Sequence, residues 1–192
     1  INSIMAVPSK YMQSVIDAAK GRPKSTAWFR DKISEFGTPK AMQLIRDGKQ
    51  SSSPFFGNLN MFFYDPKFKK TLPYYDRFPL VLPIERYSDG FLGINLHYLP
   101  IPLRIRLLDV LMDYSTDTNF DSKTKLKVLG RYKNLKSVGL IKPTLKRYLA
   151  GHVKSSFRKV DADEFVVATL LPVQRFSKAN EKKVWSDSRS MI

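Results

Sequence analysis

The sequence predicts an α+β fold: a small antiparallel β-barrel or curved sheet of about five strands, with inserted helices and an N-terminal helical extension. Three features of the chain lead to this prediction. Residues 1–50 divide into short helical stretches separated by glycines, and residues 55–100 carry short runs of Phe, Tyr, Val and Ile between Pro, Asp and Gly. The almost continuously apolar run at 164–171 then predicts a last strand, which completes the same sheet.

These features divide the chain into four expected parts. A polar segment, Gln50-Ser51-Ser52-Ser53-Pro54, marks the best candidate boundary, because residue types change on either side of it. We expect a helical extension (1–50), a linker (51–54), a barrel-like domain that contains a helical basic insertion at 101–160 (55–176), and a C-terminal tail (177–192).

The first 50 residues predict three short helices. Ser9, Ser25 or Thr26, and the pair Thr38-Pro39 supply the starting signals, and Gly21, Gly37 and Gly48 the stops. Helices this short are marginal alone, so we expect them to dock on the rest of the fold.

Residues 55–100 predict four short strands. We place them at Met61–Tyr64, Leu72–Tyr75, Leu80–Arg86 and Phe91–Leu99. Asp89-Gly90 predicts a hairpin turn, and Gly93 a bulge or sharp bend. Pro79 and Pro83 indicate that the third strand is interrupted or lies at an edge.

Residues 101–160 predict mostly helix. Pro102 starts an apolar-striped helix over 101–114. Residues 123–137 are helical or irregular. Pro143 starts another helix, which buries Leu145, Leu149, Val153 and Phe157 and places Lys146, Arg147, Lys154 and Arg158 outside. The tail is polar apart from Trp185 and predicts a short surface helix.

Positive charge concentrates in residues 122–160, here called the basic segment. It holds 12 of the 33 Lys and Arg residues and no Asp or Glu, in a chain of net charge +16. Such a concentration favours a polyanionic partner, and duplex DNA comes first. Acidic faces of neighbouring subunits, an anionic membrane surface and an unpartnered solvated face are the alternatives. The candidate nucleic-acid-binding residues are Lys123, Lys125, Lys127, Arg131, Lys133, Lys136, Lys146, Arg147, Lys154, Arg158 and Lys159.

No pattern of catalytic or metal-ligating residues stands out. The chain has no Cys and two His, and no phosphate-binding Gly-rich loop or Gly-x-Ser-x-Gly motif occurs. We expect His97 to be a packed histidine. Asp109, Asp113, Asp117 and Asp121 recur every fourth residue, yet Ser122 and Val128 stand where a calcium loop needs Gly and Glu. We therefore predict no enzymatic activity, no metal and no cofactor, and no apolar run is long enough to cross a membrane.

We do not expect the aromatic residues near the cations to recognise bases. Tyr132, Tyr148 and Phe157 are spaced as core residues, so we expect contacts with phosphates and no sequence specificity. If about six of the cations touch phosphates, log affinity falls with log salt at a slope of roughly −5.

Three stretches of the chain carry a family resemblance. They are Met61-Phe62-Phe63-Tyr64-Asp65-Pro66-Lys67, Lys70-Thr71-Leu72-Pro73-Tyr74-Tyr75-Asp76-Arg77-Phe78-Pro79-Leu80-Val81, and Gly90-Phe91-x-Gly93-x-Asn95-Leu96-His97-Tyr98-Leu99-Pro100. Together with the closing Lys183-Val184-Trp185-Ser186-Asp187-Ser188-Arg189, they resemble a virion protein family of T4-like and cyanophage contractile-tailed phages, usually labelled DNA end protector.

This resemblance implies a non-enzymatic structural protein of the virion, assembled in the bacterial host cytoplasm. Its partners would be double-stranded DNA, held by the phosphate backbone, and other virion subunits. It would hold the end of the packaged genome and shield it from exonuclease. The alternative is a neck or tail-baseplate assembly protein whose basic face binds acidic neighbouring subunits.

Overall fold

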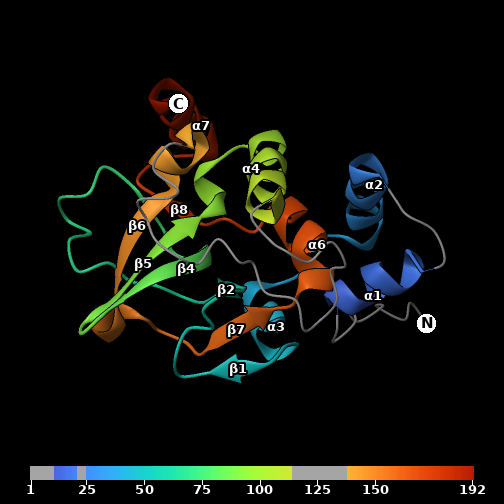
Figure 1. Ribbon diagram of the computed structural model, residues 1–192, viewed down its shortest axis with the longest axis horizontal. Coiled ribbons are helices and arrows are strands. Elements are labelled where there is room, and N and C mark those ends of the chain that lie inside the picture. Colours follow the sequence, from blue (N-terminus) through green and yellow to red (C-terminus); the bar gives the residue numbers. More distant parts are fainter. Residues whose placement is uncertain (1–10, 21–24, 114–137) are drawn as a thin grey trace, which may run out of the picture.

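The computed structural model describes residues 11–20, 25–113 and 138–192 (Figure 1). The helices in this part are α1 (Tyr11–Ala18), α2 (Thr26–Phe36), α3 (Ala41–Arg46), α4 (Ile101–Asp113), α6 (Phe165–Leu170) and α7 (Glu181–Met191), with 3-10 turns η1 (Leu96–Tyr98), η2 (Gly139–Thr144), η3 (Ala150–His152) and η4 (Ala162–Glu164). The strands are β1 (Gln50–Ser51), β2 (Leu59–Met61), β3 (Tyr75–Asp76), β4 (Leu80–Tyr87), β5 (Gly90–Asn95), β6 (Leu145–Leu149), β7 (Phe157–Val160) and β8 (Phe176–Ser177).

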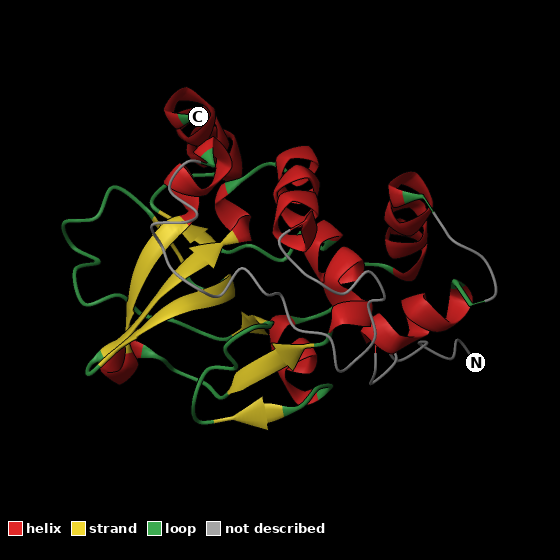
Figure 2. Cartoon of the chain, viewed as in Figure 1, coloured by secondary structure: helices red, strands yellow, loops and turns green. Residues whose placement is uncertain are grey.

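A six-stranded sheet forms the centre of the fold, in the order β1-β7-β2-β4-β5-β6, and every pair in it is antiparallel. The sheet is open, because β1 and β6 are its two edges. The α+β class is therefore confirmed and the closed barrel is not. A second small sheet pairs β3 with β8. Figure 2 shows the strands as one twisted layer, with most of the helices to its right.

The hairpin of β4 and β5 confirms the Asp89-Gly90 turn signal. Pro83 pairs with Gly93, and the register shifts immediately afterwards, between Pro83 and Glu85. The irregularity that these two residues predict is therefore present, although β4 lies inside the sheet and not at its edge.

The three N-terminal helices and α4 are confirmed. Ser25 caps α2, accepting a hydrogen bond from the backbone N–H of Trp28 at 3.1 Å, and Gly37 ends that helix at φ 79°. In contrast, α3 starts after Lys40 without a side-chain cap, two residues beyond the Thr38-Pro39 signal.

Three predicted strands differ in extent: β2 ends at Met61, β3 spans only Tyr75–Asp76, and β5 ends at Asn95, where η1 replaces the rest of the predicted strand.

Two further segments form a different type of element from the one predicted. The apolar run at 165–170 forms the helix α6, which packs between α2 and α4, so it is apolar because other helices surround it. The helix predicted from Pro143 is instead the turn η2 followed by β6, η3 and β7. The apolar residues at 145, 149, 153 and 157 fit a helical period, but all of β6 pairs with β5, from Gly90 to Ile94.

One apolar core joins the sheet to the helices. Tyr11 and Met12 of α1, Ile33 of α2 and Leu44 of α3 are at most 5% exposed and belong to the same cluster as residues of β2, β4, α4 and α6. A smaller aromatic cluster lies near the junction of β5 and β6; its members are Phe62, Tyr64, Val81, Phe91, Tyr148 and Phe157. The tail forms α7, as predicted, and the indole N–H of Trp185 donates to the carbonyl of His97 at 3.0 Å.

Candidate nucleic-acid interface

The structure places four of the described cations of the basic segment in two groups on the main sheet, while the exposed Lys142 lies on η2. Lys146 and Arg147 lie on β6, at one edge of the main sheet, whereas Arg158 and Lys159 lie on β7, near the opposite edge. Lys154 is exposed in the connection between η3 and β7. The remaining candidates fall outside the described residues: Lys123, Lys125, Lys127, Arg131, Lys133 and Lys136.

The β7 group is neutralised by nearby carboxylates. Arg158 is 2% exposed and donates two hydrogen bonds of 2.9 Å to the carboxylate of Glu164. Lys159 pairs with Asp161 at 2.8 Å. Arg158 therefore does not face solvent, contrary to the predicted outer helical face, because β7 turns it inward against α1 and η4.

The β6 group borders a cavity of about 360 Å³ between this strand and the loop that joins β2 to β3. This loop extends beside β6 at the left of Figure 1. Tyr64 fixes its start, because the Tyr64 hydroxyl accepts a hydrogen bond from the backbone N–H of Leu149 at 2.9 Å. Six aromatic residues line this cavity, here called the aromatic pocket: Tyr64, Phe68, Tyr74, Tyr75, Tyr98 and Tyr148.

Three cations also line the aromatic pocket. The ammonium of Lys146 lies 4.0 Å from the centre of the Tyr98 ring, and burial lowers the pKa of Lys146 from its ordinary value of 10.5 to about 8. Arg147 binds Asp89 and lies over the Tyr87 ring, and Lys67 lies 5.4 Å from the Phe68 ring. Among the described residues, no carboxylate forms an ion pair with Lys146 or Lys67.

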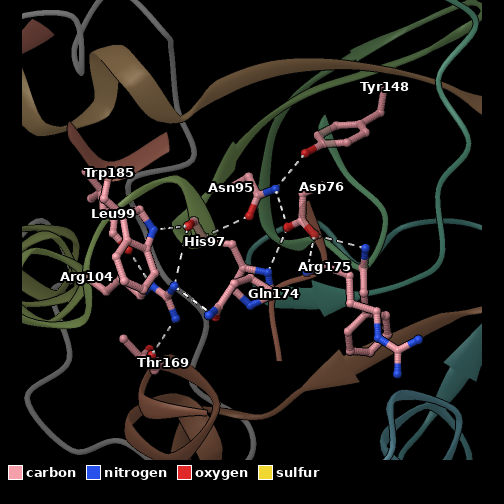
Figure 3. Close-up of polar contacts among 11 residues, drawn as sticks. Asp76, Asn95, His97, Leu99, Arg104, Tyr148, Thr169, Gln174, Arg175 and Trp185 are labelled. Atoms are coloured by element: carbon pink, nitrogen blue, oxygen red, sulfur yellow. Dashed lines mark hydrogen bonds and ion pairs between the residues drawn. The ribbon is translucent and has the colours of Figure 1, made fainter. Parts of the chain in front are cut away.

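A buried polar network supports the pocket from within the fold (Figure 3). Asp76, which lines the pocket, is 3% exposed, and both its oxygens accept hydrogen bonds. Its Oδ2 binds Nδ1 of His97 at 2.8 Å and Nδ2 of Asn95 at 3.1 Å. Its Oδ1 accepts from the backbone N–H groups of Phe78 and Arg175.

These contacts fix the charge state of the pair. Burial alone would raise the pKa of Asp76, but His97, Asn95 and the backbone N–H of Arg175 together lower it. Burial lowers the pKa of His97 and outweighs the opposing effect of Asp76. We therefore assign a neutral His97 that donates from Nδ1 to an ionised Asp76. The prediction of a packed histidine is confirmed at 0% exposure; its carboxylate partner, 21 residues upstream, is not apparent from the sequence.

Arg104 extends the same network toward the helices. It is fully buried, and its guanidinium donates to the carbonyl of Leu99 at 2.7 Å and to Oε1 of Gln174 at 3.1 Å. Burial lowers the pKa of Arg104 to about 10, which leaves it charged at neutral pH. The Trp185 ring lies 5.5 Å from this guanidinium, so α4, η1 and α7 meet around a single cation.

The acidic series does not form a metal site in the described part of the chain. Asp109 is exposed on α4, Asp113 ends that helix, and Asp117 and Asp121 fall outside the described residues. Where the structure is described, no group of three His, Asp or Glu residues is arranged to hold a metal ion. Nor does any helix in the described ranges have the length and apolarity needed to cross a membrane.

Sequence reasoning missed the aromatic pocket itself. It assigned Tyr148 and Phe157 to the core, and both are 4% exposed, while Tyr132 falls outside the described residues. The available signal was the density of Tyr and Phe between residues 62 and 75, interleaved with Lys67, Lys69 and Lys70.

Comparison with known proteins gives one match. A family model described as "Phage T4 terminal DNA protecting protein" matches residues 3–188, which is nearly the whole chain. No curated protein and no solved structure matches significantly.

Proposed function

Since the chain belongs to the phage T4 terminal DNA protecting protein family, we propose that it binds DNA without sequence specificity and protects the end of the packaged genome in the virion. The family match confirms the resemblance to DNA end protectors. In this proposal the protein is a structural component with no catalytic role, and its partners are the duplex backbone and neighbouring virion subunits.

The charge distribution is the observation that carries the proposal. The basic segment supplies +12 of the net charge of +16 and contains no acidic residue. Contacts between Lys or Arg and phosphates release counterions and do not depend on base sequence. A protein that must grip whatever sequence lies at a DNA terminus needs this kind of contact.

A protein that protects a DNA end simply by covering it needs no catalytic side chain. An exonuclease must reach the terminal phosphodiester bonds, and a protein bound over them excludes it sterically. Affinity and residence time then determine how well the end is protected.

The test combines binding with protection. We expect the protein to retard a blunt duplex at low salt, with log affinity falling against log salt at a slope of roughly −5 for about six phosphate contacts. The same duplex should resist a double-strand exonuclease when bound. Absence of retardation at low salt would overturn the proposal and favour the alternative, in which the basic face binds acidic subunits of the neck or baseplate.

A matched pair of variants locates the contacts. Lys123→Gln, Lys125→Gln and Lys127→Gln together should reduce the salt slope by about two to three. Lys20→Gln, Lys40→Gln and Lys182→Gln remove the same charge from exposed positions outside the basic segment. If the second set weakens binding as much as the first, net charge alone determines binding and the basic segment is not the contact surface.

A further inference from the structure

We propose that the aromatic pocket holds one unpaired nucleotide from the DNA terminus, its base against the tyrosine rings and its phosphate beside Lys146. This inference rests on the proposed function and adds to it, because it explains how a protein that ignores sequence recognises an end.

The size of the pocket selects a single nucleotide. At about 360 Å³ it lies in the range of roughly 300–1,000 Å³ that is usual for small-ligand sites. A duplex is too wide to enter. A base in the interior of a duplex would have to be unpaired and unstacked first, a cost that is smallest for a base that is already single-stranded. A frayed terminal base pair or a short overhang supplies such a base, so the fit favours ends.

The lining suits a nucleobase. Tyr74 and Tyr98 present rings whose centres are 6.3 Å apart, and the Tyr74 hydroxyl donates to Asp187 at 3.1 Å, which holds that ring in place. Phe68 is 61% exposed although it lines the pocket. Aromatic rings stack on any base, so such a site tolerates every terminal sequence.

The charges suit a phosphate. Lys146 is partly buried and its ammonium lies 4.0 Å from the centre of the Tyr98 ring, with no carboxylate bound to it within the described ranges. A cation withdrawn from water without a counter-charge is costly unless an anion completes the site. Lys67 and Arg147 add positive charge to the lining. Among the described residues, Asp76 is the one carboxylate in the lining, and four donors already occupy its oxygens.

The experiment compares two DNAs that differ only at their ends. The first is a duplex with a single-nucleotide overhang, prepared in two versions: one with a 5′ overhang and one with a 3′ overhang. The second is a dumbbell of the same sequence, closed at both ends by hairpin loops of an inert linker. We expect the wild-type protein to prefer the open duplex about fivefold to a hundredfold, the effect of one stacked base.

Two variants should remove this preference. Phe68→Ala deletes an exposed ring of the pocket, and Lys146→Met deletes its partly buried charge. Phe68→Ala should also leave dumbbell binding nearly unchanged, whereas Lys146→Met, which removes one of the candidate phosphate-binding cations, should weaken open-duplex binding more than dumbbell binding. Phe36→Ala and Lys142→Met are the matched controls, because both residues are exposed and neither lines the pocket. Photocrosslinking adds a readout on the wild-type protein: 5-iodouracil at the overhang, but not at an interior position, should attach to peptides that contain Tyr74 or Tyr98.

The outcomes separate the two proposals. Equal binding to open and closed DNA, or equal losses on both DNAs in the pocket variants, overturns the pocket inference and leaves DNA binding intact. Crosslinks from the overhang to peptides outside the pocket overturn it as well. Failure of the wild-type protein to bind either DNA overturns the proposed function and the pocket inference together.

Discussion

Arg158 and Lys146 come from the same acid-free stretch, twelve residues apart in the sequence, but the sheet gives them opposite environments. On β7, Arg158 meets a carboxylate in two hydrogen bonds of 2.9 Å. On β6, Lys146 meets the ring of Tyr98 and no described carboxylate. Glu164 pairs with the first cation because the chain turns at η4, immediately after β7.

This difference shows that position in a basic run does not determine what a cation does. A cation whose partner belongs to the same chain stabilises the fold, and one without such a partner remains available to an external anion. The two strands should therefore respond differently when their cations are removed: loss of stability at β7, and loss of binding at β6.

Removal of the β7 cation should give the largest effect. Arg158→Met leaves the Glu164 carboxylate half-buried without its partner, so we expect a loss of about 3–5 kcal/mol in the free energy of unfolding. Urea unfolding at neutral pH measures it. Dumbbell DNA binding by the fraction that remains folded should be nearly unchanged; a selective loss of binding would place Arg158 in the interface and break the comparison.

A glycine next to Arg158 gives the second test. A Cβ at Gly48 would collide with the guanidinium of Arg158, so Gly48→Ala should cost about 1–3 kcal/mol of stability. Gly151, near the β6 edge, is the matched control, because a Cβ there meets no atom within 4 Å. Gly151→Ala should change stability by less than about 0.5 kcal/mol. Equal costs in thermal or urea unfolding would show that Arg158 is not tightly held.

The β6 edge depends on a weaker contact. The hydroxyl of Tyr148 lies 3.2 Å from Nδ2 of Asn95, in the network of Figure 3. Tyr148→Phe removes this hydrogen bond and keeps the ring, so we expect a loss of about 1 kcal/mol in urea unfolding. A loss as large as that of Arg158→Met would mean that the two edges are equally constrained.

The effect of Lys146 on stability depends on pH, and unlike the other three changes its removal should cause no loss of stability at neutral pH. Because the pKa of Lys146 is about 8 in the folded protein and 10.5 ordinarily, the unfolded chain binds more protons at this site between pH 8 and pH 10.5. Stability should therefore rise with pH across this window. Lys146→Met should abolish that part of the rise, because Met has no proton to release, and at pH 7 it should stabilise the fold by removing the desolvated charge.

Urea midpoints at pH 7 and pH 10 measure this effect, with Lys142→Met as the control on an exposed lysine. Whereas stability rises with pH, the preference for open DNA ends should weaken as pH rises through 8, because Lys146 loses the charge that contacts the phosphate. A wild-type protein and a Lys146→Met variant with identical pH profiles would show that Lys146 is not desolvated.

Much of the fold follows from local signals. Ser25, Gly37 and the Asp89-Gly90 turn each act on their immediate neighbours, so the helices and the β4–β5 hairpin are predictable. The two errors lie where the chain depends on distant partners. Residues 165–170 are apolar in both a buried strand and a buried helix, and only α2 and α4 decide between them. Residues 145–149 become a strand because β5 offers an open edge.

Of the candidate site, only the concentration of positive charge could be predicted from the sequence. The sequence locates the basic segment, but it cannot show that Glu164 neutralises Arg158. Nor can it show that Tyr98 and Tyr74, which precede Lys146 by 48 and 72 residues, line the same pocket as Lys146. Pocket linings assembled from a loop, a 3-10 turn and an edge strand have no sequence period. Their residues come together only through the topology.

The pairing of β7 with β1 and β2 also has a consequence for biosynthesis. The partners of residues 50–61 lie roughly a hundred residues further along the chain. At translation speeds of about 5–20 residues per second, a nascent chain waits roughly 5–20 seconds before the middle of its sheet can close. During that interval β2 and its apolar neighbours leave the ribosome without their later partner. Chaperones that bind exposed apolar segments would therefore act on this chain before its sheet is complete.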